Sequence, residues 1–271
     1  MEAGITQATA WLRAADGLLI SAGAGMGIDS GLPDFRGPGG FWGVYPALGR
    51  AAIRFEAIAN PDAFRRDPRQ AWGFYGHRLA LYRATLPHAG FAMLQEIADT
   101  LSAGAFAFTS NVDGHFRKAG FAAERICEIH GSIEHLQCIA GCREQIWSAD
   151  DFQPLVDGEN CRLLNEPPVC PHCGALARPN ILMFGDWGWV ERRSALQEQR
   201  LTQWLATVKD LVVIEIGAGT TIPSVRHFSE NCGAKLIRIN PNEPEVPANQ
   251  CAISLPLGGL AGITLLRRAL A

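Results

Sequence analysis

Short apolar runs alternate along the chain with longer stretches in which apolar positions recur at helical spacing. The apolar runs predict strands at 18–21, 105–109, 125–129, 211–216, 235–239 and 251–255. The helical spacing predicts helices at 2–14, 89–100, 190–206, 223–231 and 258–270. Strands that alternate with helices in this way favour the α/β class, with a doubly wound, Rossmann-like parallel sheet.

Two segments interrupt this alternation. In the first, Asn60-Pro61 and Asp67-Pro68 each place an N-cap residue before a proline, which predicts a short helix and then a longer one at 68–84. The second, residues 135–177, is rich in cysteine, proline and polar residues. We therefore expect a Rossmann-like domain formed by residues 1–134 and 178–271, with a helical module at 44–88 within it and a small inserted module at 135–177.

The composition excludes several classes of protein. With 271 residues, of which 48% are hydrophobic, the chain can bury a large core and is not of the disordered class. A formal net charge of −3 gives no basic excess for nucleic acid or an acidic membrane surface. No apolar run approaches the ~18–20 residues of a membrane span, and the first residues lack a signal-peptide pattern. We expect a cytoplasmic protein without nucleic-acid or membrane partners.

Four of the eight cysteines are paired in a way that suggests a metal site. Cys138 and Cys142 form a C-x3-C pair, and Cys170 and Cys173 form a C-x2-C pair. Two such pairs can close a tetrahedral shell of thiolates around one zinc ion, which leaves no open position and is therefore structural. Reduced, buried thiols are the alternative, and Cys161, between the pairs, is a rival ligand.

A glycine-rich turn follows the first expected strand. Gly23, Gly25 and Gly27 place backbone N–H groups where a phosphate could bind. Residue 28 is Ile, however, so the G-x-G-x-x-G fingerprint is absent, and no acidic residue follows at the spacing of a ribose ligand. The pattern removes the main support for a dehydrogenase. On its own, this turn leaves nucleotide binding and a plain tight turn equally open.

The longer segment around this turn resembles a known family. Residues 23–42, GAGMGIDSGLPDFRGPGGFW, are similar to the NAD-binding segment of the sirtuins. Further sirtuin-like blocks follow in order: TSNVDGHFRKAG at 109–120, EIHGS at 128–132, the paired cysteines, and RPNILMFGD at 178–186. Residues 216–219 and 239–242 stand where the family has its G-T-S and I-N stretches. The resemblance covers about residues 10–260.

The resemblance implies an NAD-dependent protein-lysine deacylase that consumes NAD, releases nicotinamide and forms O-acyl-ADP-ribose from acyl-lysine proteins or peptides. It implies that His130 is the general base and that Asn111 and Asp113 hold the nicotinamide ribose and the carboxamide region; an Asx turn ahead of Gly114 is the plainer interpretation of that pair. The other residues that the resemblance assigns to NAD are Gly23, Ala24, Gly25, Met26, Pro33, Asp34, Phe35, Arg36, Trp42, Ser110, Gly217, Ala218, Gly219, Asn240, Pro241, Asn242 and Ala252. Those assigned to the substrate strand are Met183, Phe184 and Gly185.

One pair of residues bears on the acyl group. Tyr75 and Arg78 share one face of the helix expected at 68–84, because they are three residues apart. The pair resembles the one that class III sirtuins use to bind the carboxylate of succinyl- or malonyl-lysine, and a guanidinium with a phenol hydroxyl suits that group. The alternative is an ordinary amphipathic helix with a half-buried Tyr and a solvated Arg.

Departures from the family pattern keep two other functions open. Gly27 and Ser110 replace the usual Ser and Gln, Ala218-Gly219 replaces Thr-Ser, and Asp186 replaces Glu. The altered turn and Ser110 suggest, as a second hypothesis, that ADP-ribose passes to a protein side chain (mono-ADP-ribosyltransferase) or to water (NAD hydrolase). A non-enzymatic NAD-sensing module is a third.

Overall fold

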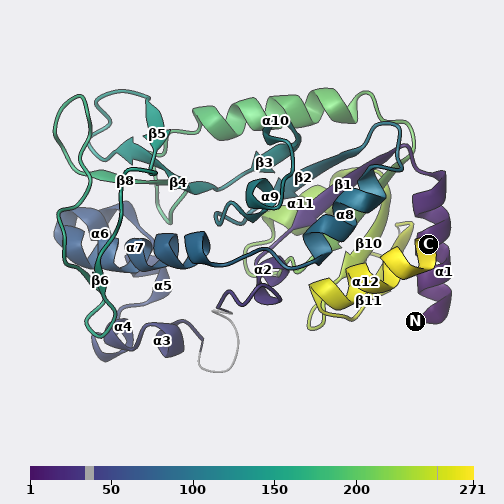
Figure 1. The fold of residues 1–271 in the computed structure, drawn as a ribbon, viewed down its shortest axis with the longest axis horizontal. Coiled ribbons are helices and arrows are strands. Elements are labelled where there is room, and N and C mark those ends of the chain that lie inside the picture. Colours follow the sequence, from purple (N-terminus) through teal and green to yellow (C-terminus); the bar gives the residue numbers. More distant parts are fainter. Residues whose placement is uncertain (34–39, 249) are drawn as a thin grey trace.

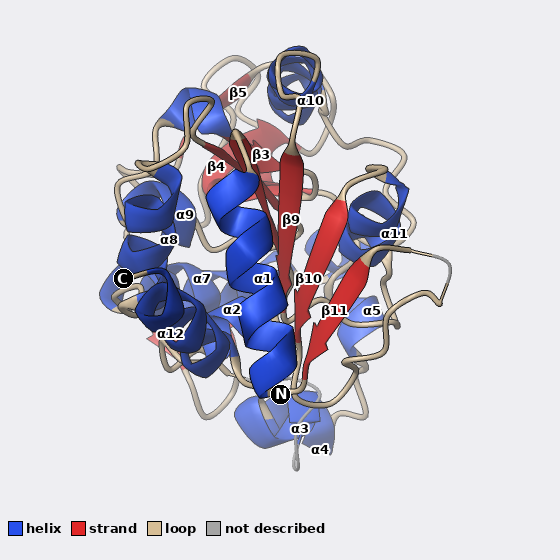
Figure 2. Cartoon of the chain, turned by 90° about the vertical axis from the view of Figure 1, so that its right-hand side faces the viewer, coloured by secondary structure: helices blue, strands red, loops and turns tan. Residues whose placement is uncertain are grey.

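The computed structural model describes residues 1–33, 40–248 and 250–271. At its centre lies a six-stranded parallel sheet in the order β11-β10-β9-β1-β2-β3, with helices on both faces (Figures 1 and 2). The strands are β1 (Gly17–Ala22), β2 (Ala105–Thr109), β3 (Ile126–Glu128), β9 (Leu211–Ile216), β10 (Lys235–Ile239) and β11 (Ala252–Leu255). The predicted fold class is confirmed, and each predicted strand is present within two residues of its expected bounds.

Strand β1 lies between β2 and β9, where the strand order reverses. Ile20 lies opposite Ala107 on one side and Ile214 on the other. All six residues of β1 are buried, because helices cover both faces of the sheet. In open α/β sheets, ligands bind outside the carboxyl ends of the strands at this reversal. The chain leaves β1 at Gly23 and β9 at Gly217, so both turns lie at that edge.

Helices pack on the two faces as the hydrophobic pattern predicts. The first face carries α1 (Glu2–Ala14), α8 (Gly90–Ala98) and α12 (Gly259–Leu270), and the second carries α10 (Arg192–Leu205) and α11 (Ser224–Asn231) (Figure 2). Ile20 packs in the first cluster with Leu94 and Ile263. Its neighbour Leu19 packs in the second with Trp204. Alternate residues of one strand thus serve two cores. Among the described residues, no helix is both long and apolar enough to cross a bilayer.

A group of helices between β1 and α8 forms one wall of the site. Their caps are those expected: Asn60 accepts a hydrogen bond from the Asp62 N–H at 2.8 Å, and Asp67 accepts one from Gln70 at 3.1 Å. The helices of this group are α2 (Gly25–Ile28), α3 (Gly40–Val44), α4 (Pro46–Arg50), α5 (Phe55–Ile58), α6 (Pro61–Arg66) and α7 (Pro68–Ala84). The short helix α9 (His115–Lys118) and a 3-10 turn, η1 (Ala123–Arg125), follow β2.

The inserted segment folds on a second, antiparallel sheet. Its strands are β5 (Ile146–Ser148), β4 (Gly131–Cys138) and β8 (Ala177–Ile181), in that order, with a hairpin of β6 (Val156–Asp157) and β7 (Arg162–Leu163). The boundaries expected near residues 134 and 178 fall inside β4 and β8, which therefore connect the segment rigidly to the main domain. The hairpin packs on α7, where a Cβ at Gly73 would lie 2.1 Å from the Cys161 carbonyl oxygen.

Candidate active site

Two glycine turns meet where the strand order reverses. The Gly23 N–H donates to the Ile216 carbonyl at 2.9 Å, and the Gly25 N–H donates to Gly217 at 3.0 Å. A Cβ on Gly25 would lie 2.6 Å from the Gly217 Cα, and Gly217 has a φ of +59°. Only residues without side chains allow this approach. We call these two packed turns the glycine cradle. The N–H groups of Gly23, Gly25 and Gly27, which the sequence offered to a phosphate, all donate to backbone carbonyls instead, so a dinucleotide phosphate would have to bind other groups of the turns.

We expect Gly217→Ala to destabilise the protein by about 1–3 kcal/mol more than Gly233→Ala. The added methyl group at position 217 would clash with the backbone of Gly25, which has little room to move. Gly233 is a matched control: its φ is +66°, but a Cβ there meets no described atom within 4 Å. Both variants carry the same left-handed backbone strain. Urea unfolding measures the difference, and equal free energies of unfolding would show that the two turns are not in close contact.

A cavity of about 610 Å³ opens beside this cradle. It lies at the carboxyl ends of β1, β2, β3 and β9, and α7 and the segment after β8 complete its wall. The loop after β2 is tied to the cradle, since Asn111 Nδ2 donates to the Gly23 carbonyl at 2.9 Å. The residues assigned from the sequence that line it are Gly23, Ala24, Pro33, Tyr75, Arg78, Ser110, Asn111, Asp113, His130, Met183, Phe184, Ala218 and Gly219.

His130 lies in this cavity as a partly buried imidazole. It follows β3, and its carbonyl accepts a hydrogen bond from the Leu182 N–H at 2.9 Å. Burial lowers the pKa of His130, and a hydrogen bond to the Ser110 backbone acts in the opposite direction. The imidazole is therefore neutral at pH 7, which is the protonation state that a general base requires.

Asp113 faces the cavity from the loop before α9. Burial raises the pKa of its carboxyl to about 6, although the His115 N–H, at 2.9 Å, and the charge of Arg78 act to lower it. The hydrogen bond to His115 is the Asx turn that the sequence offered as an alternative, so Asp113 forms that turn and also lines the cavity.

Arg78 projects into the cavity from α7 within a group of aromatic rings. Its Nε and Nη2 donate to the Tyr82 hydroxyl at 3.0 and 2.7 Å. Its guanidinium carbon lies 5.3, 5.9 and 5.3 Å from the ring centres of Phe74, Tyr75 and Tyr82. Burial acts to lower the pKa of Arg78, but Tyr82, Tyr45 and Tyr75 together raise it above its ordinary value. The guanidinium is thus held as a fixed positive charge at the cavity wall.

Tyr82 is a site residue that the sequence reasoning missed. It lies four residues after Arg78 on α7, a spacing at which helical side chains meet, so the signal was present. Tyr75 is 1% exposed and stacks on Phe64 at 5.5 Å. The apolar residues of the wall were also missed: Ile28, Leu32, Phe41, Phe55, Ala59, Val112, Ile181, Leu182, Ile222 and Val225.

The segment after β8 is fixed on both sides. The Phe184 N–H donates to the Ala59 carbonyl at 2.9 Å. Asp186 forms a fully buried ion pair with Arg178 at 2.8 Å. The carboxylate of Asp186 also accepts a hydrogen bond from the Met183 N–H at 3.3 Å. The replacement of Glu by Asp at 186 is therefore compatible with an ordered loop, and Gly185 makes its turn with a φ of +62°.

Other assigned residues lie outside the described lining of the cavity. Met26 has its side chain in the sheet core. Trp42, on α3, is 49% exposed and donates through Nε1 to the Ile53 carbonyl at 2.7 Å. Ala252 begins β11, so it lies at the end of the sheet opposite to the cradle. The structure therefore does not bring Trp42 or Ala252 to the cavity. Asp34, Phe35 and Arg36 fall outside the described residues.

Asn240 supports the second glycine turn from behind. Its Nδ2 donates to the Ala218 carbonyl at 2.9 Å, and its Oδ1 accepts from the Asn242 N–H at 3.0 Å. Pro241 lies between them in the same turn after β10. Asn240 thus fixes the backbone of this turn at Ala218.

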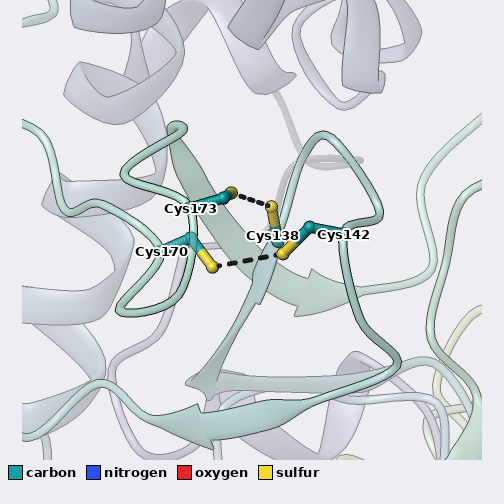
Figure 3. A group of neighbouring side chains, drawn as sticks. All are labelled: Cys138, Cys142, Cys170 and Cys173. Atoms are coloured by element: carbon teal, nitrogen blue, oxygen red, sulfur yellow. Dashed lines mark hydrogen bonds between the residues drawn. The ribbon is translucent and has the colours of Figure 1, made fainter.

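The four paired cysteines converge in the inserted segment (Figure 3). Their sulfur atoms all lie within 4.8 Å of one another, with 3.6 Å between Cys138 and Cys173 and 3.6 Å between Cys142 and Cys170. In a tetrahedral shell with Zn–S bonds of about 2.3 Å, the sulfurs lie about 3.8 Å apart. The donor set therefore fits a structural zinc ion. Cys161 is buried against α7, outside this cluster.

Comparison with known proteins gives matches over most of the chain. A family model described as the Sir2 family matches residues 23–216. An NAD-dependent protein deacylase of Pyrococcus furiosus is 31% identical over 223 residues, which are 80% of this chain and 79% of that protein. One of Aeropyrum pernix is 30% identical over 252 residues, 92% and 90% of the two chains. The solved structure of a Sir2 homologue with NAD matches the fold with a TM-score of 0.71 at 24% identity, covering 97% of this chain and 93% of that one.

Proposed function

Because this chain belongs to the Sir2 (sirtuin) family, we propose that it is an NAD-dependent protein-lysine deacylase that acts on acyl-lysine proteins or peptides. The family membership confirms the resemblance found in the sequence. NAD, when bound, supplies the ribose carbon that accepts the acyl oxygen as nicotinamide leaves. The cavity beside the glycine cradle, of about 610 Å³, has the size of an ordinary ligand pocket.

In this proposal His130 takes the proton of a ribose hydroxyl. Its neutral imidazole can accept that proton, and its position at the cavity wall places it beside Ser110 and Asn111. Asn111 is held by Gly23, so its amide is fixed where the nicotinamide ribose would lie. The apolar residues of the wall would limit the access of water to the reacting carbon, which would favour transfer of the acyl oxygen over hydrolysis.

We further propose that the preferred acyl groups carry a carboxylate, as in succinyl- and malonyl-lysine. The observation that supports this is the position of Arg78, whose fixed positive charge lines the same cavity as His130. A guanidinium pairs well with a carboxylate, and such bonds are strong in a partly dry site. The hydroxyls of Tyr75 and Tyr82 add hydrogen-bond donors on the same helix face.

We expect the purified enzyme, given NAD, to remove succinyl and malonyl groups from a peptide faster than acetyl. Arg78→Met should lower kcat/KM for the succinyl peptide by about tenfold or more, since a charged hydrogen bond contributes roughly 1.5–3 kcal/mol. The acetyl reaction of the same variant is the internal control and should change little. Mass spectrometry of the peptide and of O-acyl-ADP-ribose measures both reactions.

Each other outcome points to a different function. If the enzyme removes only acetyl groups and Arg78→Met does not change that rate, Tyr75 and Arg78 serve only in helix packing and the protein is a plain deacetylase. Nicotinamide release with free ADP-ribose or labelled protein, and no acyl transfer, would favour NAD hydrolysis or ADP-ribosyl transfer. Tight NAD binding without nicotinamide release would favour a sensing module.

A further inference from the structure

A second cavity, of about 620 Å³, lies between the inserted segment and the main domain. Its walls are β4, the loop that leads into β5, and the exposed side of α10, and Figures 1 and 2 both show β5 beside α10. Among the described lining residues, this cavity and the His130 cavity have none in common. The lining residues are His135, Arg143, Glu144, Gln145, Ile146, Arg192, Arg193, Leu196 and Arg200. We call this the arginine cavity.

The arginine cavity holds four guanidinium groups and a single lining carboxylate, that of Glu144. Arg193 forms an ion pair with Glu128. Arg143, Arg192 and Arg200 form no ion pair with any acidic residue that the structure describes. The loop before β5 and helix α10 thus place several positive charges at the arginine cavity, and few acidic side chains there neutralise them.

Polar atoms at the arginine cavity are also buried without partners. Among the described residues, Arg193 Nη1, Arg200 Nε and His135 Nδ1 are inaccessible to solvent and make no hydrogen bond. Buried polar groups are nearly always satisfied, so these three atoms leave the wall behind the cavity short of hydrogen-bond partners, while a ligand in the cavity would meet the accessible N–H groups of the arginines. Burial and the charges of Arg193 and Arg117 lower the pKa of His135 to about 4, against the effect of Asp150. The imidazole is therefore neutral and lies in a positive field.

We propose that the arginine cavity binds a small anion with several negative charges, carried by phosphate or carboxylate groups. Guanidinium groups bind both by paired N–H···O bonds, and several of them together favour a multiply charged ligand over a single chloride or acetate ion. A bound anion would bridge the loop into β5 and α10, and so would join the inserted segment to the main domain at a second place. Water alone in the cavity would leave the charges unneutralised.

Calorimetric titration of the full, zinc-loaded chain with tripolyphosphate and with citrate tests this proposal. We expect one saturable site for at least one of them, with the affinity reduced tenfold or more in Arg143→Gln/Arg200→Gln. Arg66→Gln/Arg268→Gln removes two exposed arginines elsewhere and serves as the control for net charge. Single Arg200→Gln should give a smaller loss in the same direction, and thermal unfolding of each variant checks the fold.

Saturating ADP-ribose separates this site from the one proposed for NAD. Binding that survives ADP-ribose and is lost in the Arg143/Arg200 variant supports the arginine cavity, whatever acyl group the enzyme removes. Preference for tripolyphosphate or for citrate then identifies the phosphate or carboxylate source. No binding, equal loss in both double variants, or displacement by ADP-ribose with no effect of Arg143 and Arg200 would overturn the proposal.

Discussion

We expect His130→Ala to lower kcat/KM for deacylation by about 10²–10⁴-fold, the contribution typical of a positioned general base. The structure gives the reason. His130 lies in the cavity beside the glycine cradle, and its partly buried imidazole is neutral at pH 7 because its pKa is lowered. Mass spectrometry of the deacylated peptide formed from a succinyl peptide and NAD measures the effect, and Tm and zinc content should match those of the unsubstituted protein.

The pH profile gives an independent check on the same residue. A base must be unprotonated to act, so activity should rise with pH through the lowered pKa of His130, below 6.5, and stay level above it. His227→Ala, which removes an exposed imidazole on α11, should keep both the rate and the acid limb. Full activity of His130→Ala with this limb intact would contradict the assignment of the base.

The second large effect concerns the four thiolates. We expect Cys142→Ser/Cys173→Ser, or removal of zinc by a chelator, to unfold the segment from β5 to β7 and to abolish activity. Apparent free energies of structural zinc binding are about 10–16 kcal/mol in small peptides, far more than the few contacts of a three-stranded sheet can replace. The loss should reach the active site because β4 begins at Gly131, next to His130, and β8 pairs with it.

Hydrogen exchange and metal analysis measure this effect. Exchange should accelerate in residues 139–176 while the six-stranded sheet stays protected, because that sheet has its own two cores. Cys251→Ser, which removes another exposed thiol, should change neither the zinc content nor the exchange. Retention of one zinc ion per chain by the double variant would show that other residues hold the metal.

The regular helices and strands were predictable because each one buries apolar residues that recur at a fixed spacing in the sequence. The six parallel strands and the long helices carry their signal within ten or so residues, and Asn60 and Asp67 marked helix starts through local hydrogen bonds. The antiparallel sheet was missed for physical reasons. Strand β4 has an irregular register between Ser132 and Leu136, which breaks the alternation of inward and outward residues, and β5, β6 and β7 span only two or three residues each.

The site was predictable where short motifs define it, and not where the fold assembles it. The loops of Asn111 and His130 follow strands directly, so the residues next to them in the sequence also lie next to them in space. Tyr82 and the apolar wall come from several separate elements, and the arginine cavity draws on β4, a loop and α10. Ala252 stands at the wrong end of its strand for the cradle, a fact that depends on strand direction and not on residue type.

The position of β1 has a consequence for synthesis on the ribosome. Its neighbour β9 begins at Leu211, so the edge of β1 that will pair with β9 stays open while about 190 intervening residues are made. At about 5–20 residues per second this takes roughly 10–40 s. An unpaired apolar strand invites association with other chains during that time. The emerging protein therefore needs shielding by a chaperone or by its own helices until its second half arrives.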